Sequence, residues 1–172
     1  LNLDAILEPL KALGHMADKT AAVGRKVPDF ALPSTGGRPW KLADAAGKKV
    51  VLYFYPKDNT SGCTKEGQQF GELQAEVRKA KTIVFGVSPD SLAMHEKFKA
   101  KFDFPFELLS DEEKKVCTLL GVWKEKSMYG RKYMGVERST FLIDAQGVLR
   151  QEWRKVKVDG HAAEVLTAAR DV

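Results

Sequence analysis

One stretch of the chain joins an apolar run to a polar turn and then to a helical pattern. It reads Val50-Val51-Leu52-Tyr53-Phe54, followed by Tyr55-Pro56-Lys57-Asp58-Asn59-Thr60-Ser61-Gly62-Cys63-Thr64-Lys65-Glu66. A β-branched and aromatic run that stops at proline, aspartate, asparagine and glycine predicts a buried strand that ends in a turn. The spacing after the turn predicts a helix over residues 64 to about 79.

Cys63 stands where the predicted turn becomes the predicted helix. The first turn of a helix presents unpaired N–H groups and the positive end of the helix dipole. Both favour a thiolate over a thiol, and the thiolate is the reactive form of cysteine. A free cysteine is more often a small buried apolar residue. The polar neighbours Ser61, Gly62 and Thr64 argue against that alternative and make Cys63 a candidate nucleophile.

The pattern Pro-x-x-x-Thr-x-x-Cys, formed by Pro56, Thr60 and Cys63, resembles the active-site signature of peroxiredoxins, which are thiol-dependent peroxidases. The surrounding residues resemble the bacterioferritin-comigratory or peroxiredoxin Q branch of that family. The resemblance continues through Gly86-Val87-Ser88, Leu109-Ser110-Asp111 and Glu137-Arg138-Ser139-Thr140-Phe141-Leu142-Ile143-Asp144, and covers roughly residue 23 to the end.

The resemblance implies a role for Arg138. If its strand lies beside the strand that ends at Tyr55, its guanidinium donates to the thiolate and to the peroxide. Thr60 then supplies a hydroxyl to the peroxide oxygens, and Pro56 fixes the turn and shields the thiolate from water. Taken singly, Thr60 and Pro56 could be ordinary turn residues and Arg138 a surface ion-pair partner.

Two further residues support the predicted site. The backbone N–H groups of Gly62 and Cys63 would stabilise the charge that develops on the leaving oxygen, as an oxyanion hole does. Glu66 falls near the start of the helix, where a carboxylate interacts favourably with the helix dipole. For Glu66 we favour a structural cap over a catalytic role, although the resembled family carries the same residue near its active-site helix.

The chain departs from the resembled branch in its second cysteine. An oxidised cysteine becomes a sulfenic acid that must be recycled. The branch often carries a resolving cysteine at the positions that are Gln68 and Lys99 here. The only other cysteine, Cys117, has the apolar neighbours Val116, Leu119 and Leu120, and we favour a buried structural thiol. We therefore expect a one-cysteine cycle with thioredoxin, glutaredoxin, glutathione or another external thiol. A Cys63–Cys117 disulfide, formed after local unfolding, is the alternative.

The 172 residues, 44% of them hydrophobic, are enough for one well-filled core. Strands alternate with helices and are followed by a closing hairpin and helix, which predicts an α/β domain with a mixed central sheet. The resemblance implies a thioredoxin-like fold with peroxiredoxin additions, and residues 30–42 predict an N-terminal β-hairpin. Residues 110–113 have the form of a capping box that opens a helix. Residues 122–135 are polar and aromatic, and we expect a mobile loop there.

We expect the domain to span residues 23–172 and to follow an N-terminal extension, residues 1–22. Residues 1–13 have amphipathic helical spacing interrupted by Pro9. Gly14-His15-Met16 is typical of the junction between an expression tag and a start codon. Residues 1–15 are therefore either tag-derived or natural, with no preference between the two.

Composition and charge limit the partners and the cellular compartment that we expect for the chain. The formal net charge is +5, but lysine and arginine are interleaved with aspartate and glutamate, which favours a solvated surface over a nucleic-acid site. Two distant cysteines do not make a disulfide framework and favour a reducing compartment such as the cytosol. The chain has no apolar run of membrane-spanning length, so we expect a soluble protein without membrane association. We also expect a monomer.

Other function classes have weaker support. A thioredoxin-type reductase needs Cys-x-x-Cys, and Glu66 occupies the second cysteine's position. His15, His95, His161 and the cysteines lack metal-ligand spacing, so we expect neither a metal nor a cofactor. A basic nucleic-acid-binding module would rest on Arg150, Arg154, Lys155 and Lys157, which alternate along a predicted hairpin. A redox chaperone on the same fold is a further alternative.

Overall fold

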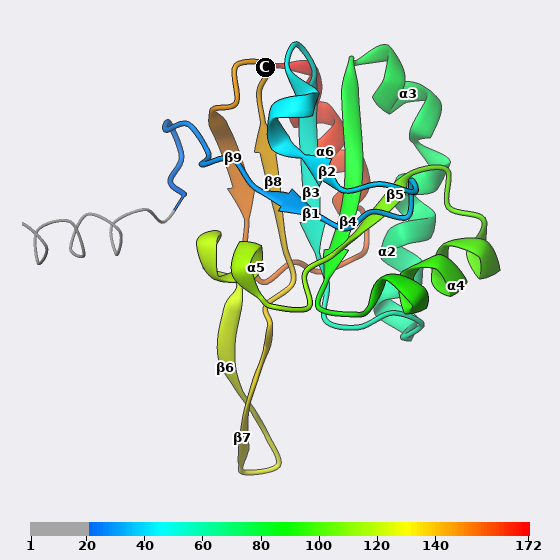
Figure 1. Cartoon of the computed structure of the whole chain (residues 1–172), viewed down its shortest axis with the longest axis vertical. Coiled ribbons are helices and arrows are strands. Elements are labelled where there is room, and N and C mark those ends of the chain that lie inside the picture. The colour runs from blue at the N-terminus through cyan, green and yellow to red at the C-terminus, as the bar shows by residue number, and fades with distance from the viewer. Residues whose placement is uncertain (1–20) are drawn as a thin grey trace, which may run out of the picture.

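The computed structural model describes residues 21–172. The predictions for the amphipathic segment 1–13 and for a start at Met16 lie outside the described residues. Figure 1 shows one central sheet covered by helices, with a long two-stranded hairpin that extends away from it. None of the helices between residues 21 and 172 has the length and apolar character needed to cross a membrane.

The central sheet has five strands in the order β5-β4-β3-β8-β9. These are β5 (Glu107–Ser110), β4 (Thr82–Ser88), β3 (Lys49–Phe54), β8 (Ser139–Ile143) and β9 (Leu149–Trp153). The pairs β3–β4 and β4–β5 are parallel, and β3–β8 and β8–β9 are antiparallel. This confirms the predicted mixed sheet and places the strand that precedes Cys63 at its centre.

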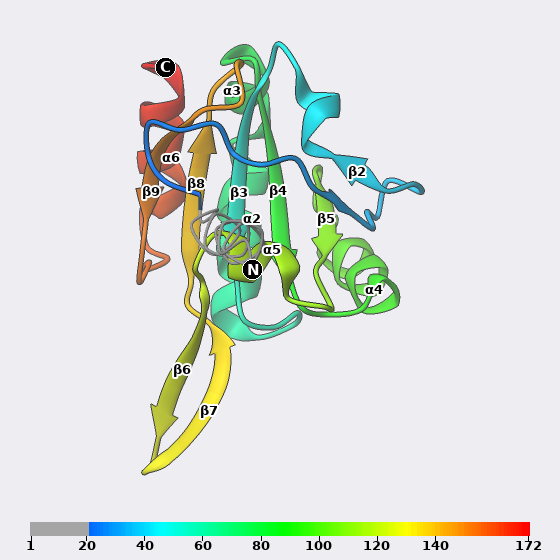
Figure 2. The same cartoon turned by 60° about the vertical axis from the view of Figure 1, so that its left-hand side comes forward.

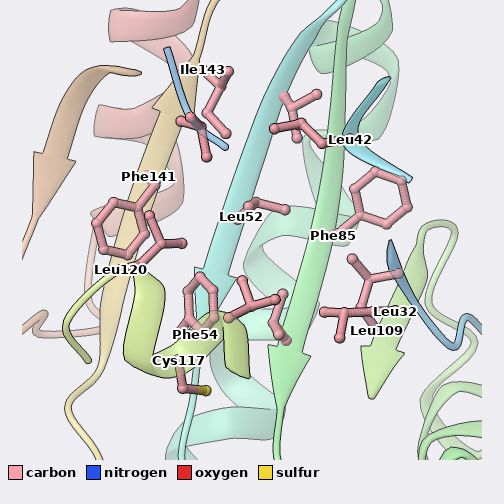
Figure 3. Close-up of a cluster of buried hydrophobic side chains, with 14 of the residues drawn as sticks. Leu32, Leu42, Leu52, Phe54, Phe85, Leu109, Cys117, Leu120, Phe141 and Ile143 are labelled. Atoms are coloured by element: carbon pink, nitrogen blue, oxygen red, sulfur yellow. The ribbon is translucent and has the colours of Figure 1, made fainter. Parts of the chain in front are cut away.

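Alternate side chains of β3 enter different layers of the core, as strand geometry requires. Leu52 and Phe54 pack with the residues shown in Figure 3, on the face that carries β1 (Ala31–Leu32), β2 (Trp40–Lys41), the 3₁₀ helix η1 (Leu42–Ala45) and α5 (Lys115–Leu119). Tyr53 and Tyr55 pack on the opposite face, against α2 (Ser61–Glu72), α3 (Gln74–Lys79), α4 (Leu92–Phe102) and α6 (His161–Arg170). Figure 2 shows α5 and α6 on opposite sides of the sheet.

Most predicted elements are present. The pair β1–β2 is the expected N-terminal hairpin. The helix expected over residues 64–79 is two helices, α2 and α3, which meet at Leu73. Ser91 begins α4 as its N-cap, and its hydroxyl accepts a hydrogen bond from the Met94 N–H.

Two predictions were wrong. Ser110 does not open a helix: it ends β5, and its hydroxyl donates to the Asp90 carbonyl, while α5 begins after Lys114. The expected loop over residues 122–135 is mainly an antiparallel hairpin, β6 (Trp123–Met128) with β7 (Arg131–Val136). Tyr129 and Gly130 connect the strands with φ of 52° and 76°, the left-handed conformation of a tight hairpin turn.

A substitution at Gly86 provides a test of the core packing between β3, β4 and β5. A Cβ atom at this position of β4 would lie 2.7 Å from the Tyr53 ring and 2.8 Å from Leu108 Cδ2, and both side chains are fully buried. We expect Gly86→Ala to lower the free energy of unfolding by about 1–3 kcal/mol, because neither neighbour has room to move. Gly135→Ala is the control, because its Cβ would meet mainly the flexible Lys126 chain, at 3.3 Å. Urea unfolding that gave the two variants equal stability would contradict this packing.

Candidate active site

Cys63 is the third residue of α2, directly after β3 and the polar turn. Thr60 precedes the helix in extended conformation as its N-cap, so the Cys63 N–H belongs to the unpaired first turn. The residue is only 1% exposed. The predicted position of the thiol at a helix N-terminus is confirmed.

Arg138 reaches Cys63 because of the register of β8. Ser139 pairs with Phe54, so the residue before Ser139 arrives beside the end of β3. The Arg138 guanidinium donates from Nη2 to the Cys63 sulfur at 3.3 Å. Burial opposes its charge, but Glu66 and Cys63 outweigh that effect and hold the pKa of Arg138 above its ordinary value. Arg138 therefore keeps its full positive charge beside the sulfur.

Glu66 binds Arg138 and is not a helix cap. It lies in the second turn of α2, and its Oε1 accepts from Arg138 Nη1 at 2.7 Å. The carboxylate is 1% exposed, and its other oxygen, Oε2, has no hydrogen-bond partner among residues 21–172. Burial raises the pKa of Glu66 from 4.5 to about 7, against the opposing charge and hydrogen bond of Arg138. The carboxyl is therefore partly protonated near neutral pH, and its Oε1 orients the guanidinium.

Gly62 leaves room for the guanidinium. A Cβ atom built on Gly62 would lie 3.3 Å from Arg138 Nη2, closer than ordinary van der Waals contact. Glycine at this position lets Arg138 approach the first turn of α2 and reach the neighbouring Cys63.

Pro56 and Thr60 lie on the turn before α2, and both are exposed. The Thr60 hydroxyl donates to the Lys57 carbonyl at 2.9 Å. Its proton is thus engaged within the turn, and its oxygen lone pairs remain available to an incoming donor. The turn is held in shape partly by Asn59, which adopts a left-handed φ of 61°.

Cys117 lies on the other side of the sheet from Cys63. It packs with Phe54 and Leu120 in the cluster of Figure 3, whereas Cys63 packs with Tyr53 and Tyr55. Burial, followed by the charge of Asp111 and a hydrogen bond to it, raises the pKa of the Cys117 thiol strongly. Its backbone N–H also donates to Asp111 Oδ2 at 2.7 Å. These contacts hold Cys117 as a thiol and separate it from Cys63.

Sequence analysis missed a cluster formed by Asp58, Asp90 and His95. Their potential ligand atoms all lie within 4.8 Å of one another. The His95 ring uses Nδ1 for Asp58 and Nε2 for the Leu109 carbonyl, at 2.6 and 2.9 Å. Because both ring nitrogens already have protein partners, the cluster is better described as a hydrogen-bonded network than as a metal centre. From the sequence, His95 was noted only as a residue without metal-ligand spacing, and no local pattern joins it to Asp58 or Asp90.

Lys126 of β6 is a second basic residue near the site that sequence analysis did not single out. Burial and the Arg138 charge lower the pKa of Lys126, while the charges of Glu137 and Cys63 act in the opposite direction. The unpredicted hairpin β6–β7 thus brings a third charged group into the electrostatic environment of the sulfur.

The basic residues proposed for nucleic-acid binding are partly engaged within the protein. Arg154 donates to the carbonyls of Leu120 and Gly121, at 2.8 and 2.9 Å, and lies 5.1 Å from the centre of the Phe141 ring. Arg150 pairs with Asp144. Two of the four basic residues therefore make contacts within the protein, which disfavours the nucleic-acid-binding alternative.

Glu66 gives the site a testable pH dependence. A carboxyl whose pKa is raised on folding stabilises the protein at low pH and loses that contribution between its unfolded and folded pKa values, here from 4.5 to about 7. We expect wild-type stability to fall over this interval by up to about 1.4 kcal/mol per pH unit relative to Glu66→Gln.

Urea unfolding across pH 4.5–8 measures this difference. Glu113→Gln is the control, because a hydrogen bond from Lys115 holds the pKa of the exposed Glu113 below its ordinary value, so its titration lies outside the interval. Parallel curves for wild type and Glu66→Gln would show that Glu66 does not titrate there.

Comparisons with known proteins agree with this geometry. Residues 23–152 match the model of the AhpC/TSA family. Peroxiredoxin Bcp of Bacillus subtilis is 48% identical over 153 residues, which cover 89% of this chain and 98% of that protein. The structure of peroxiredoxin Q from Xanthomonas campestris matches with a TM-score of 0.79 at 47% identity, covering 83% of this chain and 90% of that one. A peroxiredoxin Q from Xylella fastidiosa matches with a TM-score of 0.84 at 39% identity, covering 88% and 96%.

The predicted thioredoxin-like fold is confirmed by these structural matches. The sulfur at a helix start beside an arginine is the arrangement that a thiol peroxidase requires. The chain belongs to the AhpC/TSA family and, through its Bcp and peroxiredoxin Q relatives, is a thiol-dependent peroxidase of the peroxiredoxin class.

Proposed function

We propose that Cys63 is the peroxidatic nucleophile of a one-cysteine cycle that reduces hydrogen peroxide and small organic hydroperoxides. The observation that carries this proposal is the hydrogen bond from Arg138 Nη2 to the Cys63 sulfur at a helix N-terminus. The related bacterioferritin comigratory protein of Xanthomonas campestris, at 46% identity, has an alkyl peroxide reduction activity, which supports the inclusion of organic hydroperoxides.

In the first step the Cys63 thiolate attacks one peroxide oxygen. The S–O bond forms, the O–O bond breaks, and the leaving oxygen takes a proton and departs as water or an alcohol. Arg138 stabilises the thiolate and the charge that develops on the oxygens. The backbone N–H groups of Gly62 and Cys63 would act on the same charge. The product is a sulfenic acid on Cys63.

The turn would position the peroxide. The Thr60 hydroxyl donates to the Lys57 carbonyl, so its lone pairs can accept the hydrogen of the incoming hydroperoxide. Pro56 fixes the backbone at the start of the turn. The family resemblance implies that it also shields the thiolate from water. Glu66 would act on the guanidinium rather than on the substrate, because its oxygen binds Arg138.

Recycling requires a thiol from outside the chain. An external thiol attacks the sulfenic sulfur and releases water, and a second thiol reduces the mixed disulfide and regenerates Cys63. Thioredoxin, glutaredoxin with glutathione, or another low-molecular-weight thiol could supply both. The alternative Cys63–Cys117 disulfide needs Cα atoms about 4.4–6.8 Å apart. The two cysteines pack in different core layers, and the elevated pKa of the buried Cys117 thiol makes it a poor attacking group.

We further propose that the protein acts as a monomer in a reducing compartment such as the cytoplasm. Two free cysteines, both buried, fit such a compartment. Light scattering should give a mass near 19.1 kDa for the reduced chain. A doubled mass would show a dimer and contradict the proposed monomer.

Intact mass after one equivalent of hydrogen peroxide tests the cycle. We expect a gain of about 16 or 32 mass units on Cys63, because no internal thiol condenses with the sulfenic acid. Cys117→Ser should give the same gain and the same peroxide consumption, and Cys63→Ser should give neither. A loss of about two mass units that is absent in Cys117→Ser would establish the disulfide alternative.

Arg138→Met tests the electrostatic contribution. Removing the donor to the sulfur should lower the second-order rate of peroxide reaction by about 10²–10³-fold, the usual effect of losing one preorganised donor. Arg150→Met is the matched control, because Arg150 forms a half-exposed ion pair with Asp144 on another edge of the sheet. Stopped-flow fluorescence gives both rates. Equal rates for the two variants would remove Arg138 from the mechanism.

A further inference from the structure

Behind the turn that carries Pro56 and Thr60, the structure buries a hydrogen-bonded network of ionisable side chains that the peroxidase mechanism does not use. Asp58 lies between these two residues, and its side chain and that of His95 are both 0% exposed. The distance between His95 Nδ1 and Asp58 Oδ2 is 2.6 Å. Buried charges are expensive unless paired and hydrogen-bonded, so such a pair needs a structural or functional reason.

The hydrogen bonds of the network place two of its hydrogens. The Leu109 carbonyl can only accept, so His95 Nε2, 2.9 Å away, carries a hydrogen. Asp58 Oδ1 accepts from the Tyr55 hydroxyl at 2.6 Å. Burial raises the pKa of Tyr55, which keeps this hydroxyl protonated as a donor. The remaining contact, between His95 Nδ1 and Asp58 Oδ2, is satisfied by one hydrogen between the two atoms, so every polar atom of the pair has a partner.

The network ties the turn to three other elements. Tyr55 directly follows β3, His95 belongs to α4, and Leu109 belongs to β5. The Asp58 N–H donates to Asp90 Oδ2 at 2.9 Å, just after β4. None of the hydrogen bonds of Asp58 or His95 described here involves Cys63 or Arg138. The network therefore supports the turn that is expected to receive the peroxide, and it makes no direct contact with the sulfur.

We propose that the buried, hydrogen-bonded Asp58–His95 pair is a positioning device that holds the Pro56–Thr60 turn in the geometry that receives the peroxide. The proposal rests on the proposed function, because it concerns the same site. It assigns no direct contact with substrate to Asp58 or His95. A misplacement of about 1 Å in a reacting site can lower a rate by about 10²-fold.

Two reactions of Cys63 distinguish a misplaced turn from a general loss of active-site structure. Peroxide reduction needs both the thiolate and the turn, whereas alkylation by iodoacetamide needs only the thiolate. In a Cys117→Ser background, we expect His95→Gln to lower the peroxide rate by about 10–100-fold. The alkylation rate at the same pH should stay within about twofold of wild type.

Asp58→Asn and Asp58→Ala test the geometry of the pair. The asparagine amide can donate to a neutral His95 Nδ1, and its oxygen can still accept from Tyr55. We therefore expect Asp58→Asn to keep the peroxide rate within about threefold of wild type, and Asp58→Ala to match His95→Gln.

Ser91→Ala is the matched control on the same helix. This substitution removes the N-cap hydrogen bond to Met94 and destabilises α4, and it changes no contact of the Asp58–His95 pair. It should lower the urea midpoint and leave both Cys63 rates unchanged. If His95→Gln lowers both rates together, or leaves the peroxide rate equal to that of Ser91→Ala, the positioning role is overturned.

The wild-type protein provides a test that requires no variant to fold. Nitrogen-15 spectra should show a hydrogen on His95 Nε2, because this atom lies 2.9 Å from the Leu109 carbonyl. An Nε2 without a hydrogen would overturn the network. A wild-type Cys63 that did not react with peroxide would instead refute the proposed function, and the spectrum would still report on the pair.

Discussion

The antiparallel register of β8 on β3 is the constraint on which the site depends. Ser139 pairs with Phe54, and this pairing puts Arg138 beside the residue that ends the central strand. A shift of one residue would turn every side chain of β8 to the other face of the sheet. Both faces are buried here, so such a shift would also break the core. The same packing that stabilises the sheet thus fixes the position of the guanidinium.

The guanidinium lies between two ionisable side chains on one helix. Glu66 and Cys63 are three residues apart on α2, the spacing that puts two side chains on the same face of a helix. Arg138 donates to Glu66 through Nη1 and to Cys63 through Nη2. When Glu66 takes up a proton, Arg138 has one anionic partner fewer, so the balance of charge at the sulfur depends on a carboxyl that titrates near neutral pH. A point-charge lysine could not reproduce this two-sided contact.

Local signals in the sequence were sufficient for most of the fold. The strand that precedes Cys63, the parallel neighbour β4 and the capped start of α4 all follow from period, β-branched composition and turn residues. The hairpin β6–β7 was missed because most of its side chains are solvated, so it lacks the apolar alternation of a half-buried strand. Its one local signal was the Tyr129-Gly130 turn.

The site was predictable only in part, for a physical reason. A thiol at a helix start can be read from neighbouring residues, and the resemblance supplied Arg138. The partnership of Glu66 with Arg138 depends on a contact 72 residues apart, and that of Asp58 with His95 on one 37 residues apart. No local pattern encodes such a pairing. For Glu66 the helix-dipole argument even led to the wrong role, because the carboxylate faces the core rather than the helix N-terminus.

The sheet between the two cysteines has a consequence for the kinetics of the cycle. A resolving thiol within the chain would act at a fixed effective concentration, set by the fold. In the proposed one-cysteine cycle the thiol arrives by collision, so the lifetime of the oxidised enzyme would vary inversely with the amount of reduced thiol around it. When peroxide is abundant and thiols are scarce, further oxidation of the same sulfur would compete with rescue. Such a cycle would couple the turnover of the peroxidase to the thiol supply of its surroundings.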